Sequence, residues 1–269
     1  MASLQKFVLL LSLPCSVNAF KVFSSTTRTR CRNFYQRASN NDIQEPDVSS
    51  SNFGRKDYWN EAYKKEEEFT WYSGWSDVAP FFTELVPVHK STRILLPGIG
   101  NDSSMVDMYD EGFRHMTAFD YAPEGVECAT RFFGVDRLLS CGLPDGTPVR
   151  DDGEEGVDLR VVDARQLTYE DDSFDAVLEK GTLDAIYLSG ADDKKVASEQ
   201  LALSVSELAR VVQKGGIVVS ITAACAEAVE LAFRDTNVWK VRRDGTFHVT
   251  EDGYCSNNVD ATIFAWERL

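Results

Sequence analysis

Residues able to bind a small ligand recur at the ends of four short apolar segments. The segments 93–96, 116–120, 159–163 and 174–179 are followed by or end on Gly98-Ile99-Gly100-Asn101, Asp120, Asp163 and Glu179, respectively. Gly98 allows a tight turn, and Gly100 allows the backbone to approach a ligand with no Cβ in the way. Carboxylates can accept hydrogen bonds from hydroxyl and amine groups. The pattern indicates a site for a nucleoside.

The spacing of these residues discriminates between two nucleoside ligands. Asp120 lies 22 residues beyond Gly98 and could accept both ribose hydroxyls, and Asp163 could accept the adenine amine. A dinucleotide site needs G-x-G-x-x-G/A, but Ser103 stands at the third small position and Asp102 puts a negative charge where a pyrophosphate would lie. S-adenosylmethionine has no phosphate, and its sulfonium and amine are cationic. The acidic strand ends therefore favour this cofactor over NAD.

The elements that position these residues alternate between strand and helix patterns. Helices are expected at 103–109, 123–133, 194–213 and 223–233, with further strands at 217–221, 239–242 and 262–267. This alternation predicts an α/β fold with a mainly parallel sheet. The carboxyl ends of parallel strands share one edge, where such sheets bind their ligands.

Two segments depart from this alternation. Residues 134–158 are rich in glycine, proline and acidic residues, and we expect an exposed acidic insertion loop. Residues 58–88 form a lead-in that is rich in tryptophan and tyrosine. Either segment could contribute to a ligand site, and ordinary core packing is an equally good explanation of the aromatic residues.

The charge is divided unequally along the 269 residues. The chain has a net charge of −15, yet residues 1–56 hold 8 basic and 3 acidic residues, so the body from residue 57 is close to −20. Such a body repels phosphate backbones, which makes nucleic acid a poor partner. The six cysteines and three histidines are scattered without metal-ligand spacing, so no metal site is expected.

The basic leader is typical of a targeting sequence. Residues 1–19 combine a lysine, a short apolar core and small residues before a cleavage point after Ala19, as in a signal peptide. Residues 20–41 have five basic residues and no acidic one, so 20–56 are interpreted as a transit peptide and linker. The Ala19-Phe20 junction resembles the bipartite presequence of algae with secondary plastids. We expect plastid import, with mitochondrial import or secretion as alternatives, and no membrane anchor.

The motifs together resemble class I (seven-β-strand) S-adenosylmethionine-dependent methyltransferases. Within that class the chain is most similar to the lysine methyltransferases that act on elongation factor 1A and citrate synthase. The resemblance covers residues 58–269. It is carried by Tyr58-Trp59-Asn60-Glu61-Ala62-Tyr63, Trp71-Tyr72, the run 94–101, Phe119-Asp120-Tyr121, the run 172–185 with Lys180-Gly181-Thr182-Leu183-Asp184, and Gly215-Gly216.

This resemblance implies a methyltransferase domain over residues 57–269. Its fold would be a Rossmann-like seven-stranded sheet, mostly parallel with one antiparallel strand and with helices on both faces. The lead-in 58–88 would cover the cofactor as a lid. The implied cofactor-binding residues are Trp59, Gly98, Ile99, Gly100, Asn101, Asp120, Tyr121, Asp163, Ala164, Glu179, Lys180 and Gly181. Glu179 and Asp184 are the catalytic candidates, because either could orient an acceptor amine.

Three departures from the family pattern bear on function. Ile99, Asp102 and Glu179 stand where the family usually has Cys, Ser and Asp, and Asp102 could repel the cofactor carboxylate. The favoured function is methylation of a protein lysine. Methylation of a small molecule and a non-catalytic binding module with the same fold are the alternatives, and the oligomeric state is left open.

Overall fold

The computed structural model describes residues 52–65, 68–140, 155–223, 225–247 and 261–269. The expected signal peptide, most of the expected transit peptide and residues 141–154 of the expected insertion loop lie outside these ranges.

Seven strands form one sheet in the order β3-β2-β1-β4-β5-β7-β6. They are β1 (Arg93–Pro97), β2 (His115–Asp120), β3 (Gly156–Val161), β4 (Phe174–Lys180), β5 (Val212–Thr222), β6 (Trp239–Phe247) and β7 (Ala261–Arg268). Strand β7 runs antiparallel to both of its neighbours, and β1 to β5 pair in parallel. The predicted fold class, a mostly parallel seven-stranded sheet with one antiparallel strand, is confirmed.

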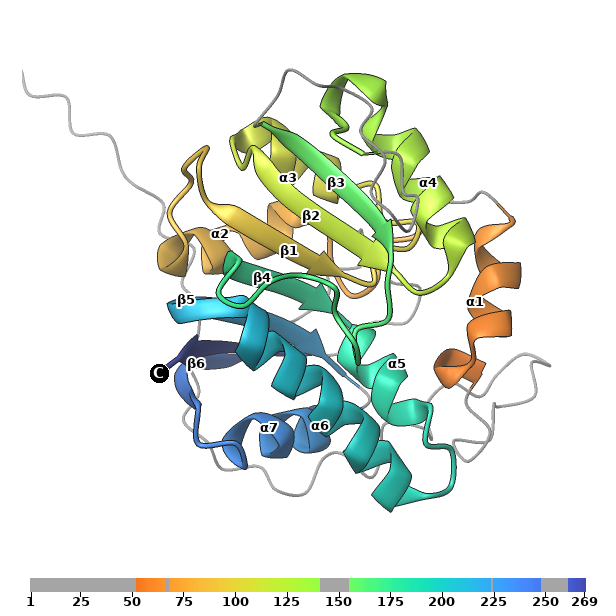
Figure 1. Ribbon diagram of the computed structural model, residues 1–269, viewed down its shortest axis with the longest axis vertical. Coiled ribbons are helices and arrows are strands. Elements are labelled where there is room, and N and C mark those ends of the chain that lie inside the picture. Colours follow the sequence, from red (N-terminus) through yellow and green to blue (C-terminus); the bar gives the residue numbers. More distant parts are fainter. Residues whose placement is uncertain (1–51, 66–67, 141–154, 224, 248–260) are drawn as a thin grey trace, which may run out of the picture.

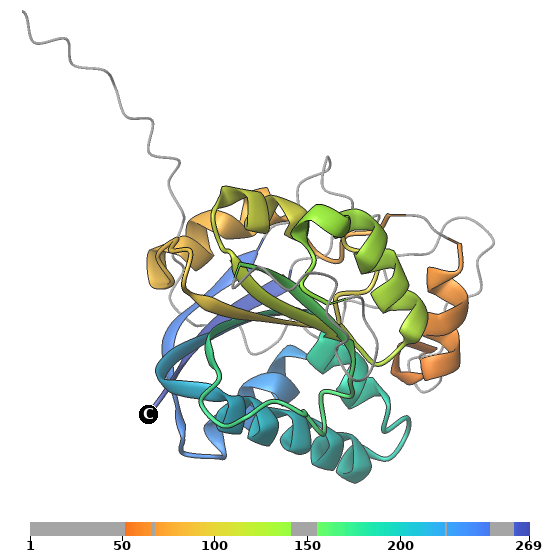
Figure 2. The same ribbon diagram turned by 45° about the horizontal axis from the view of Figure 1, so that its top comes forward.

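Helices cover both faces of this sheet (Figures 1 and 2). One face carries α2 (Trp75–Leu85), α3 (Met105–Glu111) and α4 (Pro123–Phe133), and the other carries α5 (Thr182–Leu188), α6 (Lys194–Val211) and α7 (Ala226–Arg234). Alternate side chains of each strand enter opposite cores: Ile94 and Leu96 pack with the first set of helices and Leu95 with the second. Strand β1 is apolar after Arg93 because both of its faces are buried.

The aromatic-rich segment 58–88 divides into two structural parts. Helix α1 (Lys56–Tyr63), preceded by a short 3-10 turn at Asn52–Gly54, packs against α4 at one edge of the domain. Helix α2 buries Trp75, Val78 and Phe82 in the core, at helical spacings of three and four residues. The second part of the segment is therefore a core helix.

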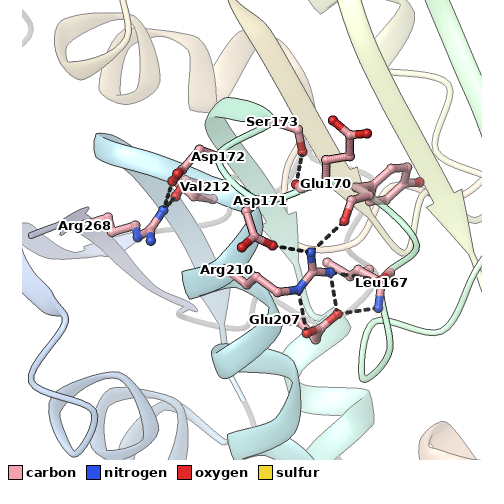
Figure 3. A network of polar contacts seen from close by, with 10 residues as sticks. Leu167, Glu170, Asp171, Asp172, Ser173, Glu207, Arg210, Val212 and Arg268 are labelled. Carbon is pink, nitrogen blue, oxygen red and sulfur yellow. Dashed lines mark hydrogen bonds and ion pairs between the residues drawn. The ribbon is translucent and has the colours of Figure 1, made fainter.

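A polar network fixes the loop that leads into β4 (Figure 3). The Arg210 guanidinium of α6 donates to Glu207 on its own helix, to the Asp171 carboxylate at 2.9 Å, and to the Leu167 carbonyl at 2.9 Å. Arg268 of β7 joins the same loop at Asp172 and also contacts the Val212 carbonyl. The start of β4 is thereby anchored, which helps to set where its last residues lie.

Two further findings concern the part of the chain that the structure describes. No helix there is long and apolar enough to cross a bilayer. Within the same residues, no group of three or more histidine, cysteine or acidic side chains could hold a metal ion.

Candidate functional site

A glycine turn connects β1 to α3 at the carboxyl edge of the sheet. Gly98 and Gly100 have φ angles of +63° and +50°, in the left-handed region that favours glycine. A Cβ on Gly98 would lie 2.2 Å from the Thr182 hydroxyl oxygen, and one on Gly100 would lie 2.7 Å from the Tyr63 hydroxyl oxygen. Both positions therefore require glycine, which leaves the turn's backbone close to whatever occupies the adjacent pocket.

Asp120 lies beside this turn at the end of β2 and is 2% exposed. Its Oδ2 atom accepts hydrogen bonds from the Gly100 amide at 3.1 Å and from the Tyr63 hydroxyl at 3.4 Å, and Oδ1 accepts from the Ala122 amide at 2.9 Å. Burial raises the pKa of Asp120 to about 6, although the Ala122 and Gly100 amides act to lower it. The carboxylate is thus held in place and half-protonated in mildly acidic solution.

Tyr63 is a site residue that the sequence reasoning did not select for binding. Its ring stacks on Trp59 with centroids 5.5 Å apart, and its hydroxyl reaches Asp120. Trp59 and Tyr63 are four residues apart, which places them on one face of α1. This spacing could have indicated from the sequence that Tyr63 lies beside Trp59.

Asp163 follows β3 and is paired with Arg165. The guanidinium donates from Nε to Oδ1 at 2.8 Å and from Nη2 to Oδ2 at 2.5 Å, while its Nη1 donates to Gln200 of α6. Partial burial raises the pKa of Asp163, but the hydrogen bonds from Arg165 outweigh it and leave that pKa below its usual value. A ligand amine would meet a carboxylate that already has a partner.

Glu179 lies at the end of β4 and is 1% exposed. Its Oε1 atom contacts the Ser220 hydroxyl, and Oε2 accepts from the Leu183 amide at 3.2 Å. Burial raises the pKa of Glu179 to about 8. The Thr182 amide contributes a further hydrogen bond, so about one of its roughly four acceptor positions remains for another donor.

Asp184 of α5 has no such spare acceptor position. Oδ2 accepts from the Tyr72 hydroxyl at 2.7 Å and the Ala223 amide at 3.0 Å, and Oδ1 accepts from the Thr222 hydroxyl and the Cys225 amide. Four donors satisfy a carboxylate. Burial raises the pKa of Asp184. Asp184 is therefore better placed to anchor Tyr72 than to contact a methyl acceptor.

Residues 69–73, which we call the lid, connect α1 to α2 and contact the glycine turn. The Phe69 amide donates to the Asn101 carbonyl at 3.2 Å, and the Thr70 hydroxyl donates to Asp102 at 3.0 Å. Tyr72 has a φ of +64°, an uncommon backbone conformation for a residue with a side chain, and its ring lies against Gly181. Polar contacts of Phe69 and Thr70 hold the first end of the lid, and the hydrogen bond from Tyr72 to Asp184 holds the other.

Asp102 and Lys180 form a buried ion pair that the sequence reasoning did not anticipate. Their side chains are 9% and 8% exposed, and Lys180 Nζ lies 2.5 Å from Asp102 Oδ2. Lys180 also donates to the Ser73 carbonyl at 2.7 Å. The negative charge that the sequence placed beside the glycine turn is therefore neutralised by the residue that ends β4.

A pocket lies between the lid and the glycine turn. Among the sequence-derived candidates, its lining includes Gly98, Ile99, Gly100, Asn101 and Lys180. It also includes Tyr63, Phe69, Trp71, Leu96, Pro97, Asp102, Met105 and Leu178. The remaining candidates stand outside this lining: Trp59, Asp120, Tyr121, Asp163, Ala164, Glu179, Gly181 and Asp184. The pocket is mostly apolar, with one ion pair at its wall.

Comparisons with known proteins relate this chain to methyltransferases. A family model described as a methyltransferase domain matches residues 95–220. EEF1A lysine methyltransferase 4 of Mus musculus is 30% identical over 189 residues, which are 68% of this chain and 67% of that protein. The eEF1A lysine and N-terminal methyltransferase homolog of Drosophila melanogaster is 31% identical over 176 residues, or 63% of this chain, but the match spans only 22% of that longer protein.

Solved structures show the same fold at low identity. Geranyl diphosphate C-methyltransferase from Streptomyces coelicolor A3(2), in complex with S-adenosyl-L-homocysteine, matches with a TM-score of 0.56 and 12% identity, covering 82% of this chain and 99% of that chain. At this identity the likeness establishes the fold, while the nature of the acceptor is a separate question.

Proposed function

Because the chain belongs to the class I S-adenosylmethionine-dependent methyltransferases, we propose that it methylates a lysine side chain of a protein. The observation that carries this proposal is the similarity to a lysine methyltransferase that extends over two thirds of each chain. The strongly acidic body supports it, because a negative surface raises the association rate of a basic protein substrate.

The residues of the site fit S-adenosylmethionine. Gly98 and Gly100 line the pocket with backbone alone, and the wall of the pocket is electrically neutral because Asp102 is paired with Lys180. The buried carboxylate of Asp120 suits a ribose and would repel a phosphate. The cofactor, when bound, supplies an electrophilic methyl group on its sulfonium.

We place the cofactor along the strand ends. The glycine turn would hold the methionine portion, Asp120 with Tyr121 the ribose, and Ala164 with Asp163 the adenine. Trp59 does not line the pocket. It would support the pocket wall through its stack on Tyr63. The protein's contribution is mainly alignment, an effect worth up to about 7–11 kcal/mol in favourable systems.

The acceptor amine must be neutral before it can attack a methyl group. Phe69 and Trp71 line the pocket, and an apolar aromatic wall disfavours the ammonium form of an entering lysine. Glu179 has about one acceptor position to spare, so it is the candidate to orient the amine, and Asp184 acts as a positioning residue through Tyr72.

Cofactor binding should depend on pH through Asp120. The ionised carboxylate accepts the ribose hydroxyls, and protonation competes with them. Because the pKa of Asp120 is about 6, we expect affinity for 5′-methylthioadenosine to fall about tenfold from pH 7 to pH 5 and to be constant above pH 7. Titration calorimetry measures this directly. The Asp120→Asn variant serves as control and should bind weakly at every pH, whereas a flat profile in the unsubstituted protein would contradict the assignment.

The acceptor class can be determined with labelled cofactor. The purified protein is incubated with methyl-labelled S-adenosylmethionine and a cell extract, and label is then measured separately in protein and in small molecules. We expect label on protein, removed by an excess of S-adenosylhomocysteine and traced to methyl-lysine after hydrolysis. Label confined to small molecules would replace the proposal with the small-molecule alternative, and absence of label with intact cofactor binding would favour the non-catalytic one.

A further inference from the structure

Asp102 and Lys180 stand out among the residues that line the pocket. They are the ionisable acid and base of its lining, and they face each other from the end of the glycine turn and the end of β4. Burial of a charge pair is costly unless further hydrogen bonds complete its coordination. The contacts of each atom therefore show what the pair still lacks.

The two oxygens of Asp102 differ in their contacts. Oδ1 accepts from the Thr70 hydroxyl at 3.0 Å, from the Ser104 amide at 3.0 Å and from the Ser104 hydroxyl at 2.6 Å. Oδ2 has Lys180 as its partner among the described residues. A carboxylate oxygen offers about two acceptor positions, so Oδ1 is saturated and Oδ2 has one left.

The ammonium of Lys180 shows the matching deficit. Of its three N–H donors, one serves Asp102 and one serves the Ser73 carbonyl, within the part of the chain that the structure describes. One donor is left beside the acceptor position of Asp102 Oδ2. An adjacent free donor and free acceptor, both charged and both at a pocket wall, suit a zwitterion such as an α-amino acid.

We infer that Asp102 is a cofactor-binding residue, whose Oδ2 atom accepts a hydrogen bond from the α-ammonium of the cofactor's amino-acid end while Lys180 faces its carboxylate. Asp102 thereby attracts one end of the cofactor instead of repelling the other. The inference depends on the cofactor and not on the protein acceptor, so it is independent of whether lysine is the methylated group.

A purely structural role for Asp102 makes a different prediction. If Asp102 served only to hold the lid through Thr70, its loss would weaken all ligands of the pocket equally. If it binds the ammonium, only ligands that carry the amino group would lose affinity. The two roles are separated by combining a protein substitution with a matched change in the ligand.

The experiment measures binding by calorimetry, without any methyl acceptor, for S-adenosylhomocysteine and for its analogue that lacks only the α-amino group. In the unsubstituted protein we expect loss of the amino group to weaken binding by about tenfold or more, the value of a charged hydrogen bond. In the Asp102→Asn variant, loss of the amino group from the ligand should weaken binding by about twofold or less. Thr70→Val is the matched control, since it removes the hydrogen bond from the lid to Asp102 but keeps the Asp102 carboxylate. In this variant, loss of the amino group from the ligand should still weaken binding by about tenfold.

Two results would overturn the inference. One is an equal cost of removing the amino group in Asp102→Asn and in the unsubstituted protein. The other is equal affinity of the unsubstituted protein for both ligands, a measurement that does not require the variant to fold.

Discussion

The Asp120→Ala variant is expected to bind S-adenosylmethionine about 10²–10⁴ times more weakly than the unsubstituted protein and to lose methyl transfer accordingly. Each charge-assisted hydrogen bond to a ribose hydroxyl contributes about 1.5–3 kcal/mol, and the substitution removes both. It also releases Gly100 and Tyr63, which contact the same carboxylate, so the glycine turn loses part of its support. Calorimetry with the cofactor measures the loss.

The fold should survive this substitution. Desolvation disfavours the Asp120 carboxylate in the folded protein, and its removal relieves that cost while leaving the amides of Gly100 and Ala122 without their acceptor. Thermal unfolding of the variant checks that its domain is intact. Asp110→Ala, at an exposed aspartate of α3 that pairs with Arg137, is the control and should bind cofactor normally. Full affinity in Asp120→Ala would exclude the ribose assignment.

The sheet was predictable because its strands carry a strong local pattern. Runs such as 93–96 and 174–179 are apolar, short and bounded by turn residues, and the helix expected at 123–133 has the bounds that the structure gives to α4. The order of these elements predicts a parallel sheet, and a parallel sheet places its strand ends at one edge. Local sequence thus determined both the architecture and the edge at which the site lies.

The pairing of charges across the site could not be read from the chain. Lys180 is 78 positions beyond Asp102, and their contact depends on β4 lying next to β1, which periodicity does not specify. The same holds for Asp163, whose carboxylate is taken by Arg165, a neighbour in sequence that could equally have faced solvent. Ion pairing depends on which strands lie side by side in the folded sheet. Because Asp102 is paired with Lys180, the pocket wall is neutral at the position where the sequence predicted repulsion of the cofactor carboxylate.

Helices α2 and α5 were missed for a different reason. The aromatic residues of 58–88 suggested a single lid, but Trp75 and Phe82 recur at a spacing that buries them against the sheet. Helix α5 has only seven residues and begins after Gly181, where φ is +77°. A helix this short has little local pattern, and tertiary contacts such as those of Asp184 stabilise it.

The second large effect is expected at Asp184, and it is an effect on stability. Replacing Asp184 with alanine leaves the hydroxyls of Tyr72 and Thr222 and the amides of Ala223 and Cys225 without their acceptor. An unsatisfied buried group costs about 1–3 kcal/mol, and removing a desolvated carboxylate offsets part of the sum. We expect a loss of about 3–5 kcal/mol in the free energy of unfolding, measured by denaturant titration.

Two comparisons test whether this loss comes from the buried contacts of Asp184. Asp193→Ala removes an exposed aspartate that accepts from the Lys195 and Val196 amides at the start of α6, and such a cap contributes about 1 kcal/mol. Tyr72→Phe removes one of the four donors and should cost less than Asp184→Ala while weakening the lid. If Asp184→Ala were no more destabilising than Asp193→Ala, the anchor role would be wrong, and Asp184 would be free to act on the acceptor amine.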